Sequence, residues 1–526
     1  MLSLRLLLAC LLLPSVFLSH SASIDSPVWF AIPGALSVLL LILVVTEIYA
    51  RTPTGLLRFA VGFLALTPVA IYLFAQLLSY ELQGSYFNQR FFFHFNLNTL
   101  LTAGQAFTRV ILIFVLWLLS LWLVLWRYAR YPFHCQRIPA GAVSCALLLA
   151  LISDPGLFGS TRDAIAFNLA TEEFVLENTD WEGLNLNSRA LTKTAPAGTA
   201  GKNLLLIYLE GLENIYTDES LFPGLTPNLA RLSKQGQRLS NVSQTLGTGW
   251  TIAGISASHC GTPLLYYAEV NGNEVDFSNF LANVRCTGDL LKAAGYQQTY
   301  MGGADIAFAN KGTFLSRHGY DRVLGRNELG PLLADPEKMG GWGLYDEDLL
   351  QLAVTEFDRL AQQQQPFALT LLTVDTHHPV GEPSPSCTPY GEIDNSILHA
   401  VHCSDQLIGK FMDSIQAHPA YADTVVILMS DHLGMRNAAF ELFPPDYPRK
   451  LFFLALNHER PILEPDEVSH MDIAATLPSL LEMEHNLSFL AGFDLTARQK
   501  PPALDSVSRL QQEHAIATIN SSIFSP

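Results

Sequence analysis

The chain has 526 residues, of which 49% are hydrophobic and only 15% are charged, so it is too long and too apolar for one ordinary soluble domain. Its formal net charge of −17 argues against a nucleic-acid partner, because binding to a phosphate backbone depends on clustered Lys and Arg. An anionic substrate would instead depend on a metal ion and on single bases such as Lys311, Arg317 and Arg436. Nearly all long apolar runs precede residue 156, and the composition after residue 202 is typical of a globular domain.

Five apolar stretches are long enough to cross a bilayer, which takes about 20 residues. They lie near residues 4–20, 28–49, 56–79, 108–127 and 138–155. The first stretch has an alternative interpretation as a cleaved signal peptide, because Arg5 precedes its apolar core and small residues follow it. The sequence therefore predicts a multi-span helical membrane domain of about five helices.

Basic residues predict the orientation of these spans. Arg51 and Arg58 flank the second loop, several arginines between residues 127 and 137 fill the fourth, and the first loop has none. Loops rich in Lys and Arg stay on the cytoplasmic side. Five spans then carry everything after residue 155 to the outer face of the membrane.

Four of the seven cysteines lie in the soluble part of the chain, at positions 260, 286, 387 and 403. In an oxidising compartment they could form two disulfides, for which the sequence alone allows three connectivities. If they pair, we expect Cys260 with Cys286 and Cys387 with Cys403, because these partners flank compact segments. The alternative is four buried free thiols.

After residue 203, short apolar runs alternate with amphipathic stretches, which predicts an α/β domain with a central, mostly parallel sheet. The expected strands are 204–209, 298–301, 367–374, 424–429 and 451–456. The expected helices are 226–236, 289–294 and 346–362. The predicted domains are a transmembrane domain at 1–155, a connector at 156–201, a catalytic domain at 202–495 and a polar tail at 496–526.

Polar residues follow three of these strands at the point where each ends. Glu210 follows the first, Asp375-Thr376-His377-His378 ends the strand from residue 367, and Asp431-His432 ends the strand from residue 424. In open α/β sheets, ligands bind outside the carboxyl ends of the strands. We therefore expect carboxylates and imidazoles from three strands at one edge of the sheet.

The motifs resemble, in chain order, those of the sulfatase/alkaline phosphatase superfamily and its lipoteichoic acid synthase-like branch. The motifs are NLLLIYLE at 203–210, TPNL at 226–229, GWT at 249–251, DH at 431–432 and HMDIAAT at 470–476. Three segments look like the glucan-modifying phosphoglycerol transferase I type of this branch. They are TLGTGWTIAGISASHCGTP at 245–263, LTVDTHHP at 372–379 and SDHLGM at 430–435.

The resemblance implies that one divalent cation is bound by Glu210, Thr251, Asp431 and His432. Manganese is the expected ion, with Mg²⁺ and Zn²⁺ as alternatives, because carboxylate oxygens and one imidazole suit hard metals better than thiolate-binding ones. Coordination would lower the pKa of the Thr251 hydroxyl and prepare it as the nucleophile. The structural alternatives are a solvated Glu210 at a strand end and Thr251 as a helix N-cap.

The resemblance also assigns residues around the substrate. His377 matches the family histidine near the substrate phosphate, as hydrogen-bond donor or as acid to the leaving oxygen, and His378 competes for this role. Lys311 is a candidate replacement for the headgroup arginine of lipoteichoic acid synthases. Asp346 falls where the family has an acidic residue, although helix capping explains it equally well. We therefore predict His377 as catalytic and His378, Lys311 and Asp346 as substrate-binding.

The function that the resemblance implies is transfer of phosphoglycerol from phosphatidylglycerol to hydroxyls of periplasmic glucans. The transfer passes through a covalent glycerophosphothreonine and releases diacylglycerol. The chain would be a multi-pass protein of a bacterial inner membrane with its catalytic domain in the periplasm. The alternatives are a related headgroup transferase of the lipoteichoic acid synthase or phosphoethanolamine type, and an inactive membrane sensor or scaffold. The sequence leaves the acceptor, the metal and the oligomeric state open.

Overall fold

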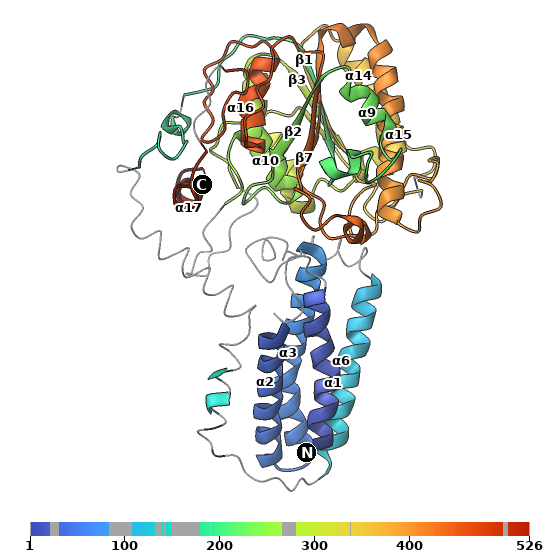
Figure 1. The fold of residues 1–526 in the computed structure, drawn as a ribbon, viewed down its shortest axis with the longest axis vertical. Coiled ribbons are helices and arrows are strands. Elements are labelled where there is room, and N and C mark those ends of the chain that lie inside the picture. Colours follow the sequence, from blue (N-terminus) through green and yellow to red (C-terminus); the bar gives the residue numbers. More distant parts are fainter. Residues whose placement is uncertain are drawn as a thin grey trace. The chain divides into compact units, whose positions relative to one another are not determined.

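The structure is a computed structural model that describes most of the chain (Figure 1). It describes residues 2–21, 31–83, 108–131, 179–192, 194–265, 280–336, 338–497 and 503–524, with a few single residues between 139 and 149. The chain divides into two compact units, Met1–Phe167 and Asn168–Pro526, which are considered separately below.

The first unit is helical. Its helices are α1 (Leu2–Ser21), α2 (Ala31–Arg51), α3 (Leu56–Gln83) and α6 (Thr108–Ala129). Among the described residues, three helical segments are long and apolar enough to cross a membrane: 34–51, 56–76 and 111–129. They correspond to the second, third and fourth predicted spans. The first predicted span is helical in α1, with a shorter apolar stretch at Leu4–Leu13, and most of the fifth lies outside the described residues.

Helix α1 packs on the other helices of this unit through Leu4, Leu8 and Leu12, which are buried. A polar contact accompanies this packing. The buried carboxylate of Glu47 in α2 lies 3.7 Å from the guanidinium of Arg5 in α1 and 3.1 Å from that of Arg51. A buried carboxylate requires such partners, because it has lost its hydration. Glu47 therefore links the start of α1 to the end of α2.

The second unit contains an eight-stranded sheet with the order β4-β3-β5-β1-β6-β7-β2-β8. Its strands are β1 (Asn203–Leu209), β2 (Gln237–Ser243), β3 (Gln297–Gly302), β4 (Arg322–Leu324), β5 (Phe367–Leu372), β6 (Thr424–Ser430), β7 (Leu451–Leu456) and β8 (Val468–Ser469). Within this described sheet only β7 is antiparallel to its neighbours. The α/β fold with a mostly parallel sheet is confirmed, and all five predicted strands are present.

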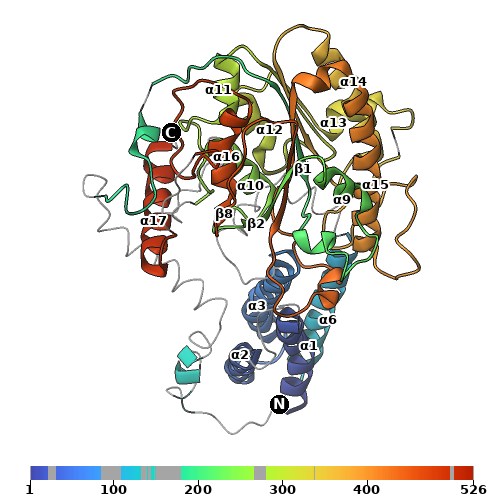
Figure 2. The same ribbon diagram turned by 45° about the horizontal axis from the view of Figure 1, so that its top comes forward.

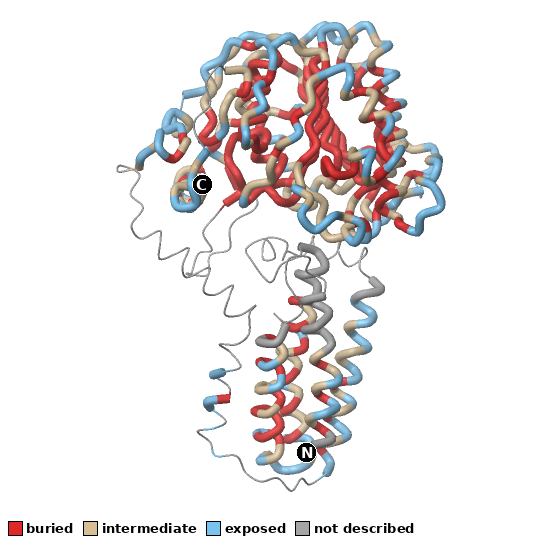
Figure 3. Tube along the Cα trace, viewed as in Figure 1, coloured by how far each residue is buried: buried red, intermediate tan, exposed pale blue. Residues whose placement is uncertain are grey.

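The central strands are buried along their whole length (Figure 3). Continuous apolar runs such as LLLIYL in β1 and VVILM in β6 are typical of strands covered on both faces. One face is covered by α9 (Pro227–Ser233), α14 (Asp346–Ala361) and α15 (Ser396–Ala417), which share a hydrophobic core with the strands (Figure 1). The other face carries α10 (Thr251–Cys260), α11 (Thr287–Ala293), α12 (Lys311–Arg317) and α16 (His470–Leu480) (Figure 2).

The sequence offered no structure for the tail after residue 496, but the tail contains helix α17 (Ser506–Ile519), which is followed by a π-helical turn (Asn520–Phe524). Asn520 is fully buried. Its amide nitrogen donates to the carbonyls of Pro263 and Leu265, both at 2.9 Å, and its oxygen accepts from the Thr262 hydroxyl at 3.1 Å. The tail is therefore fixed to the segment that follows α10.

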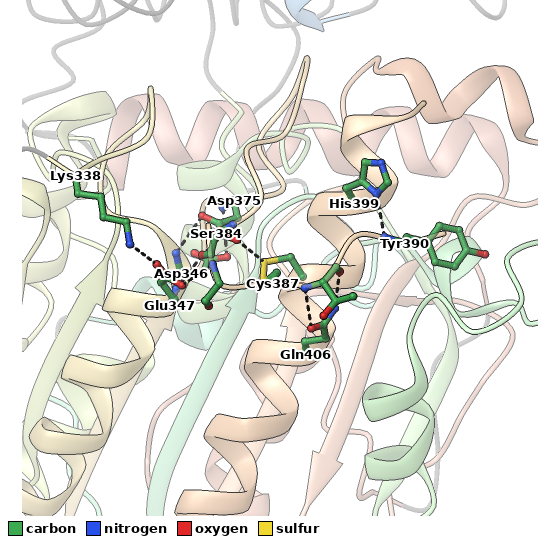
Figure 4. Close-up of a disulfide and its surroundings, with 12 residues drawn as sticks. Lys338, Asp346, Glu347, Asp375, Ser384, Cys387, Tyr390, His399 and Gln406 are labelled. Carbon is green, nitrogen blue, oxygen red and sulfur yellow. Dashed lines mark hydrogen bonds and ion pairs between the residues drawn. A yellow bond between two sulfur atoms is a disulfide. The ribbon is translucent and has the colours of Figure 1, made fainter. Parts of the chain in front are cut away.

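Both expected disulfides are present. Cys260 at the end of α10 is bonded to Cys286, which precedes α11, and Cys387 is bonded to Cys403 in α15. Figure 4 shows the second of these bonds with its surroundings. The predicted pairing is thus confirmed.

The Cys260–Cys286 bond should stabilise the fold, because it closes a sequence separation of 26 residues and restricts the unfolded chain. We expect the double variant Cys260→Ser/Cys286→Ser to lose about 3 kcal/mol of unfolding free energy, measured by denaturant unfolding of the detergent-solubilised protein. The matched control is Cys10→Ser, since Cys10 is free. A double variant as stable as the wild type under non-reducing conditions would contradict this expectation.

Candidate metal and nucleophile site

The register of β1 and β6 brings two carboxylates together. The strands are parallel with Leu209 opposite Ser430, so the next residues, Glu210 and Asp431, leave the sheet side by side at its carboxyl edge. Both are buried, with 3% and 0% exposure. The Nε2 atom of His432 lies 3.4 Å from an oxygen of each carboxylate. The structure thus brings together three of the four predicted metal ligands.

The fourth predicted ligand, Thr251, is the first residue of α10. Its hydroxyl oxygen donates to Glu210 Oε2 at 3.4 Å, and the residue is half-buried. The N-cap of α10 is Trp250, so the interpretation of Thr251 as the cap does not describe this helix. The Thr251 hydroxyl therefore points toward Glu210 and does not cap helix α10.

The donor atoms fit a divalent cation. His432 Nδ1 lies 2.7 Å from the Leu433 carbonyl, to which it can only donate, so Nε2 is the ring atom that faces the carboxylates and would offer its lone pair to a bound cation. Asp431 Oδ1 accepts from the backbone N–H groups of Gly211 and His432, at 3.0 and 2.9 Å. Asp431 Oδ2 is buried and has no hydrogen-bond partner among the described residues. Its contact with His432 Nε2, at 3.4 Å, is long for a hydrogen bond, and a cation would satisfy this buried oxygen better.

The charges of the site also require a cation. Burial raises the pKa of Asp431 to about 7, and the neighbouring Glu210 charge adds to this shift. Burial works against a charged imidazole, but the carboxylates of Asp431 and Glu210 outweigh it and raise the pKa of His432 to about 10. Protein groups alone therefore balance two carboxylates with one imidazolium. A divalent ion would displace that proton and supply a second positive charge.

His377 lies beside this cluster in the loop after β5. Its ring centroid is 3.9 Å from that of Trp342, and its Nδ1 donates to the His378 carbonyl at 2.8 Å. Burial lowers the pKa of His377, while the charge of Glu210 opposes this shift, so the ring is close to the carboxylates. The neutral ring that donates from Nδ1 has its acceptor at Nε2.

His378 lies deeper than His377 and is only 7% exposed. Neither of its ring nitrogens has a hydrogen-bond partner among the described residues. Burial holds its pKa well below the ordinary value, so the ring is neutral. Of the two histidines, only the half-buried His377 has exposed surface suited to a substrate contact.

Lys311 begins α12 and is 4% exposed. Burial lowers the pKa of its ammonium group, but the charges of Glu210, Asp431 and Asp305 act in the opposite direction. Lys311 is therefore a buried basic group within electrostatic reach of the carboxylate cluster.

Asp346 has a different environment from the one predicted for a substrate-binding residue. It is completely buried, and its carboxylate accepts from the backbone N–H groups of Val374 at 2.7 Å and Asp375 at 3.3 Å (Figure 4). Asp375 in turn accepts from the Asp346 N–H and from the backbone and hydroxyl of Ser384. These contacts fit a residue that positions the loop carrying His377, and they leave no free surface for a substrate.

Three residues that hold the backbone of Glu210 and Asp431 were not predicted from the sequence. Thr376 donates its hydroxyl to the Glu210 carbonyl at 2.6 Å, and Thr373 accepts from the Glu210 N–H at 3.0 Å. His470 Nε2 donates to the Asp431 carbonyl at 2.7 Å. All three lie in motifs that were recognised, but a side chain that bonds to a distant backbone group leaves no pattern in the sequence.

A second group of possible ligands, Cys286, Asp289 and His318, does not form a metal site. The sulfur of Cys286 is bonded to Cys260, so no thiolate is available. His318 Nδ1 is paired with Asp289 at 3.0 Å. Among the described residues, the cluster at Glu210, Asp431 and His432 is thus the one that suits a metal ion.

The chain is similar to curated proteins of one name. Proteins named phosphoglycerol transferase I from Salmonella arizonae and Salmonella typhimurium are 37% identical to this chain over 366 residues. The match covers 68% of this chain and 46% of each relative. The chain therefore spans about half the length of the curated relatives it matches.

Two solved structures share the fold. An alkaline phosphatase superfamily protein from Vibrio parahaemolyticus matches with a TM-score of 0.51 and 21% identity, over 69% of this chain and 96% of its own. The integral membrane protein lipooligosaccharide phosphoethanolamine transferase A from Neisseria meningitidis matches with a TM-score of 0.50 and 16% identity, over 86% and 89%. The family model described as Sulfatase matches residues 202–483, which is more than half of the chain. The chain thus belongs to the sulfatase family.

Proposed function

We propose that this chain is an enzyme that transfers phosphoglycerol from phosphatidylglycerol to hydroxyls of periplasmic glucans and releases diacylglycerol. The observation that carries the proposal is the Thr251 hydroxyl, 3.4 Å from Glu210 and beside the buried Asp431–His432 pair. The relatives named phosphoglycerol transferase I support the phosphoglycerol group as cargo.

In the first step the Thr251 oxygen attacks the phosphorus of the lipid. A P–O bond to Thr251 forms, the P–O bond to diacylglycerol breaks, and the proton that the Thr251 hydroxyl gives up passes to the leaving diacylglycerol oxygen. A divalent cation, which we propose to be Mn²⁺ held by Glu210, Thr251, Asp431 and His432, would lower the pKa of the hydroxyl and offset phosphate charge. The backbone N–H groups at the start of α10 would also stabilise the negative charge of the phosphate.

In the second step a glucan hydroxyl attacks the same phosphorus and regenerates Thr251. His377 is suited to accept the hydroxyl proton, because its neutral ring donates from Nδ1 and has its acceptor at Nε2. Lys311 would contribute positive charge to the phosphoglycerol group. Asp346 would act indirectly, by holding the backbone that leads to His377.

We also propose that the protein is a multi-pass protein of a bacterial inner membrane with the α/β unit in the periplasm. Three helices suited to cross a membrane support the anchoring, and two disulfides fit an oxidising compartment. An anchor raises the effective concentration of a lipid donor at the site.

Replacement of the nucleophile tests the mechanism. Thr251→Ala should lower transfer of labelled glycerophosphate by roughly 10³-fold or more, since both steps pass through this oxygen. Thr251→Ser should keep part of the activity, because the hydroxyl remains. Loss of one long hydrogen bond should cost only about 1 kcal/mol of stability. Donor lipid without acceptor should leave glycerophosphate on Thr251, measurable by peptide mass spectrometry.

Thr248 supplies the control for this experiment. It is fully buried, and its hydroxyl donates to the Thr245 carbonyl at 2.9 Å. Thr248→Ser keeps that bond and should keep transfer. An adduct on Thr248, or full activity of Thr251→Ala, would show that the nucleophile is misassigned. Transfer from ethanolamine-labelled lipid in place of the glycerol-labelled lipid would instead change the proposed cargo.

Metal content tests the ligand set. The purified full chain should contain one divalent ion, and Asp431→Asn should lose it, as measured by elemental mass spectrometry. Without metal, Asp431→Asn should unfold at a higher temperature than metal-free wild type, because it removes one of two adjacent buried carboxylates. The control is Asp423→Asn, an exposed carboxylate outside the site. Retention of the ion in Asp431→Asn would contradict the assignment.

Fusion reporters test the orientation. A reporter that is active only in the periplasm should be active when fused after Gly201 and inactive when fused within residues 130–137. The expected pattern follows from the arginines in that loop. The reverse pattern of activity would overturn the proposed topology.

A further inference from the structure

A cavity of about 540 Å³ opens on the α/β unit, and none of the four predicted metal ligands lines it. Its walls are the loop before α10, the start of α16, the loop at residues 491–493 and helix α17. Figure 2 shows α17 on the same side of the sheet as α10 and α16. Cavities of roughly 300–1,000 Å³ are the size that binds small organic ligands.

The wall formed by α17 lies outside the part of the chain that the family model matches. The family model ends at residue 483, so the loop at 491–493 and the whole of α17 lie beyond it. This wall is held firmly, because Asn520 is bonded into the segment after α10 and Gln512 donates to the Leu184 carbonyl at 2.8 Å. A fixed wall outside the shared core is suited to specificity and not to the shared chemistry.

The cavity adjoins the proposed site through two of its walls. Gln244 lines the cavity and accepts from the backbone N–H of Leu433 at 2.8 Å, directly after His432. Met471 also lines it and follows His470, whose ring donates to the Asp431 carbonyl. The loop from Gln244 continues through the half-exposed Leu246 to the nucleophile helix. A ligand in this cavity would therefore lie next to the site without occupying it.

The charges of the cavity disfavour an anionic ligand. Its acidic lining residues outnumber its one arginine, Arg509, which is already paired with Glu467 at 2.9 Å. The acidic residues are Asp466, Glu467, Asp472 and Glu513. A phosphate or a lipid headgroup would meet net repulsion here. The charges of the lining therefore disfavour binding of the lipid donor in this cavity.

The same lining favours hydroxyl groups. Glu513 is half-buried and makes no hydrogen bond with the described residues, so its carboxylate remains free to accept from a ligand. The amide of Gln512 lies next to it in the chain and also lines the cavity. Phe493, Ile516 and Leu246 add apolar surface. A sugar ring presents hydroxyl donors and apolar C–H faces, and these walls match both.

We propose that this cavity binds a neutral glycan segment and that the segment is the acceptor whose hydroxyl attacks the phosphothreonine. The proposal rests on the proposed function and deepens it. In the transfer step a bond forms between the glycan oxygen and phosphorus, and the bond between phosphorus and the Thr251 oxygen breaks. The hydroxyl proton passes by way of His377 to the released Thr251 oxygen, so the enzyme returns to its starting state.

Kinetics of the full-length protein test the cavity. The donor is glycerol-labelled phosphatidylglycerol in vesicles, and the acceptor probe is a neutral β-linked glucose hexasaccharide. Ala503→Trp places a bulky ring at an exposed position of the lining, and Glu513→Ala removes the free carboxylate. Each should raise the KM for the hexasaccharide about tenfold, the effect of losing one good hydrogen bond or comparable contact. The KM for the lipid should stay the same.

Gln511→Ala is the matched control, because Gln511 is exposed on α17 and does not line the cavity. It should leave the KM for the hexasaccharide unchanged. Unaltered hexasaccharide KM in both cavity variants would overturn the proposal, even though transfer itself continues.

Calorimetric titration of the same proteins with the hexasaccharide separates this proposal from the proposed function. Binding by the wild type that is lost in Ala503→Trp would support the cavity as a glycan site even if no lipid were consumed, and only the proposed function would then fail. Undiminished binding by Ala503→Trp would overturn the cavity assignment whatever the activity.

Discussion

The site depends on two carboxylates that are forced together and kept from water. Parallel pairing of β1 and β6 places Glu210 beside Asp431, and both are buried. Like charges in such a position repel each other strongly, because little solvent screens them. The single imidazole of His432 offsets only part of this charge. The register of the sheet therefore creates a demand for positive charge, which a divalent ion fits.

The surrounding backbone keeps this unfavourable arrangement in place. Hydrogen bonds from Thr376 and to Thr373 hold the Glu210 backbone, and His470 holds that of Asp431. Helix α10 approaches closely at Gly254, where a Cβ atom would lie only 1.8 Å from the Asp431 carbonyl oxygen. Thr251 is less than one helical turn before Gly254, so this close approach also sets the Thr251 hydroxyl beside Glu210. The two carboxylates and the Thr251 hydroxyl are thus positioned by backbone contacts more than by each other.

Much of the fold and the ligand cluster could be predicted, because both follow from local patterns. The runs that form β1 and β6 are apolar throughout, and a polar residue directly after such a run must lie at the edge of the sheet. Strand β2 was missed because its sequence, QRLSNVS, is half polar and only partly buried. Asp346 was predicted to bind substrate. Its position in the chain does not reveal that its carboxylate accepts hydrogen bonds from the backbone N–H groups of Val374 and Asp375. Contacts between distant segments leave no local signal.

The role of helix α17 could not be predicted from its local sequence either. Its sequence is polar, and only a short stretch around Ile516 and Ile519 is buried, so composition alone gives no reason to expect a wall of a cavity. The proposed metal-binding edge would act on any phosphodiester that reaches it, since it would recognise charge and not the alcohol that accepts the phosphate. Discrimination between the proposed glycan hydroxyl and water would then come from holding the glycan in place before reaction. Helix α17, fixed through Asn520 and carrying the carboxylate of Glu513 toward the cavity, would meet that requirement without disturbing the carboxylates.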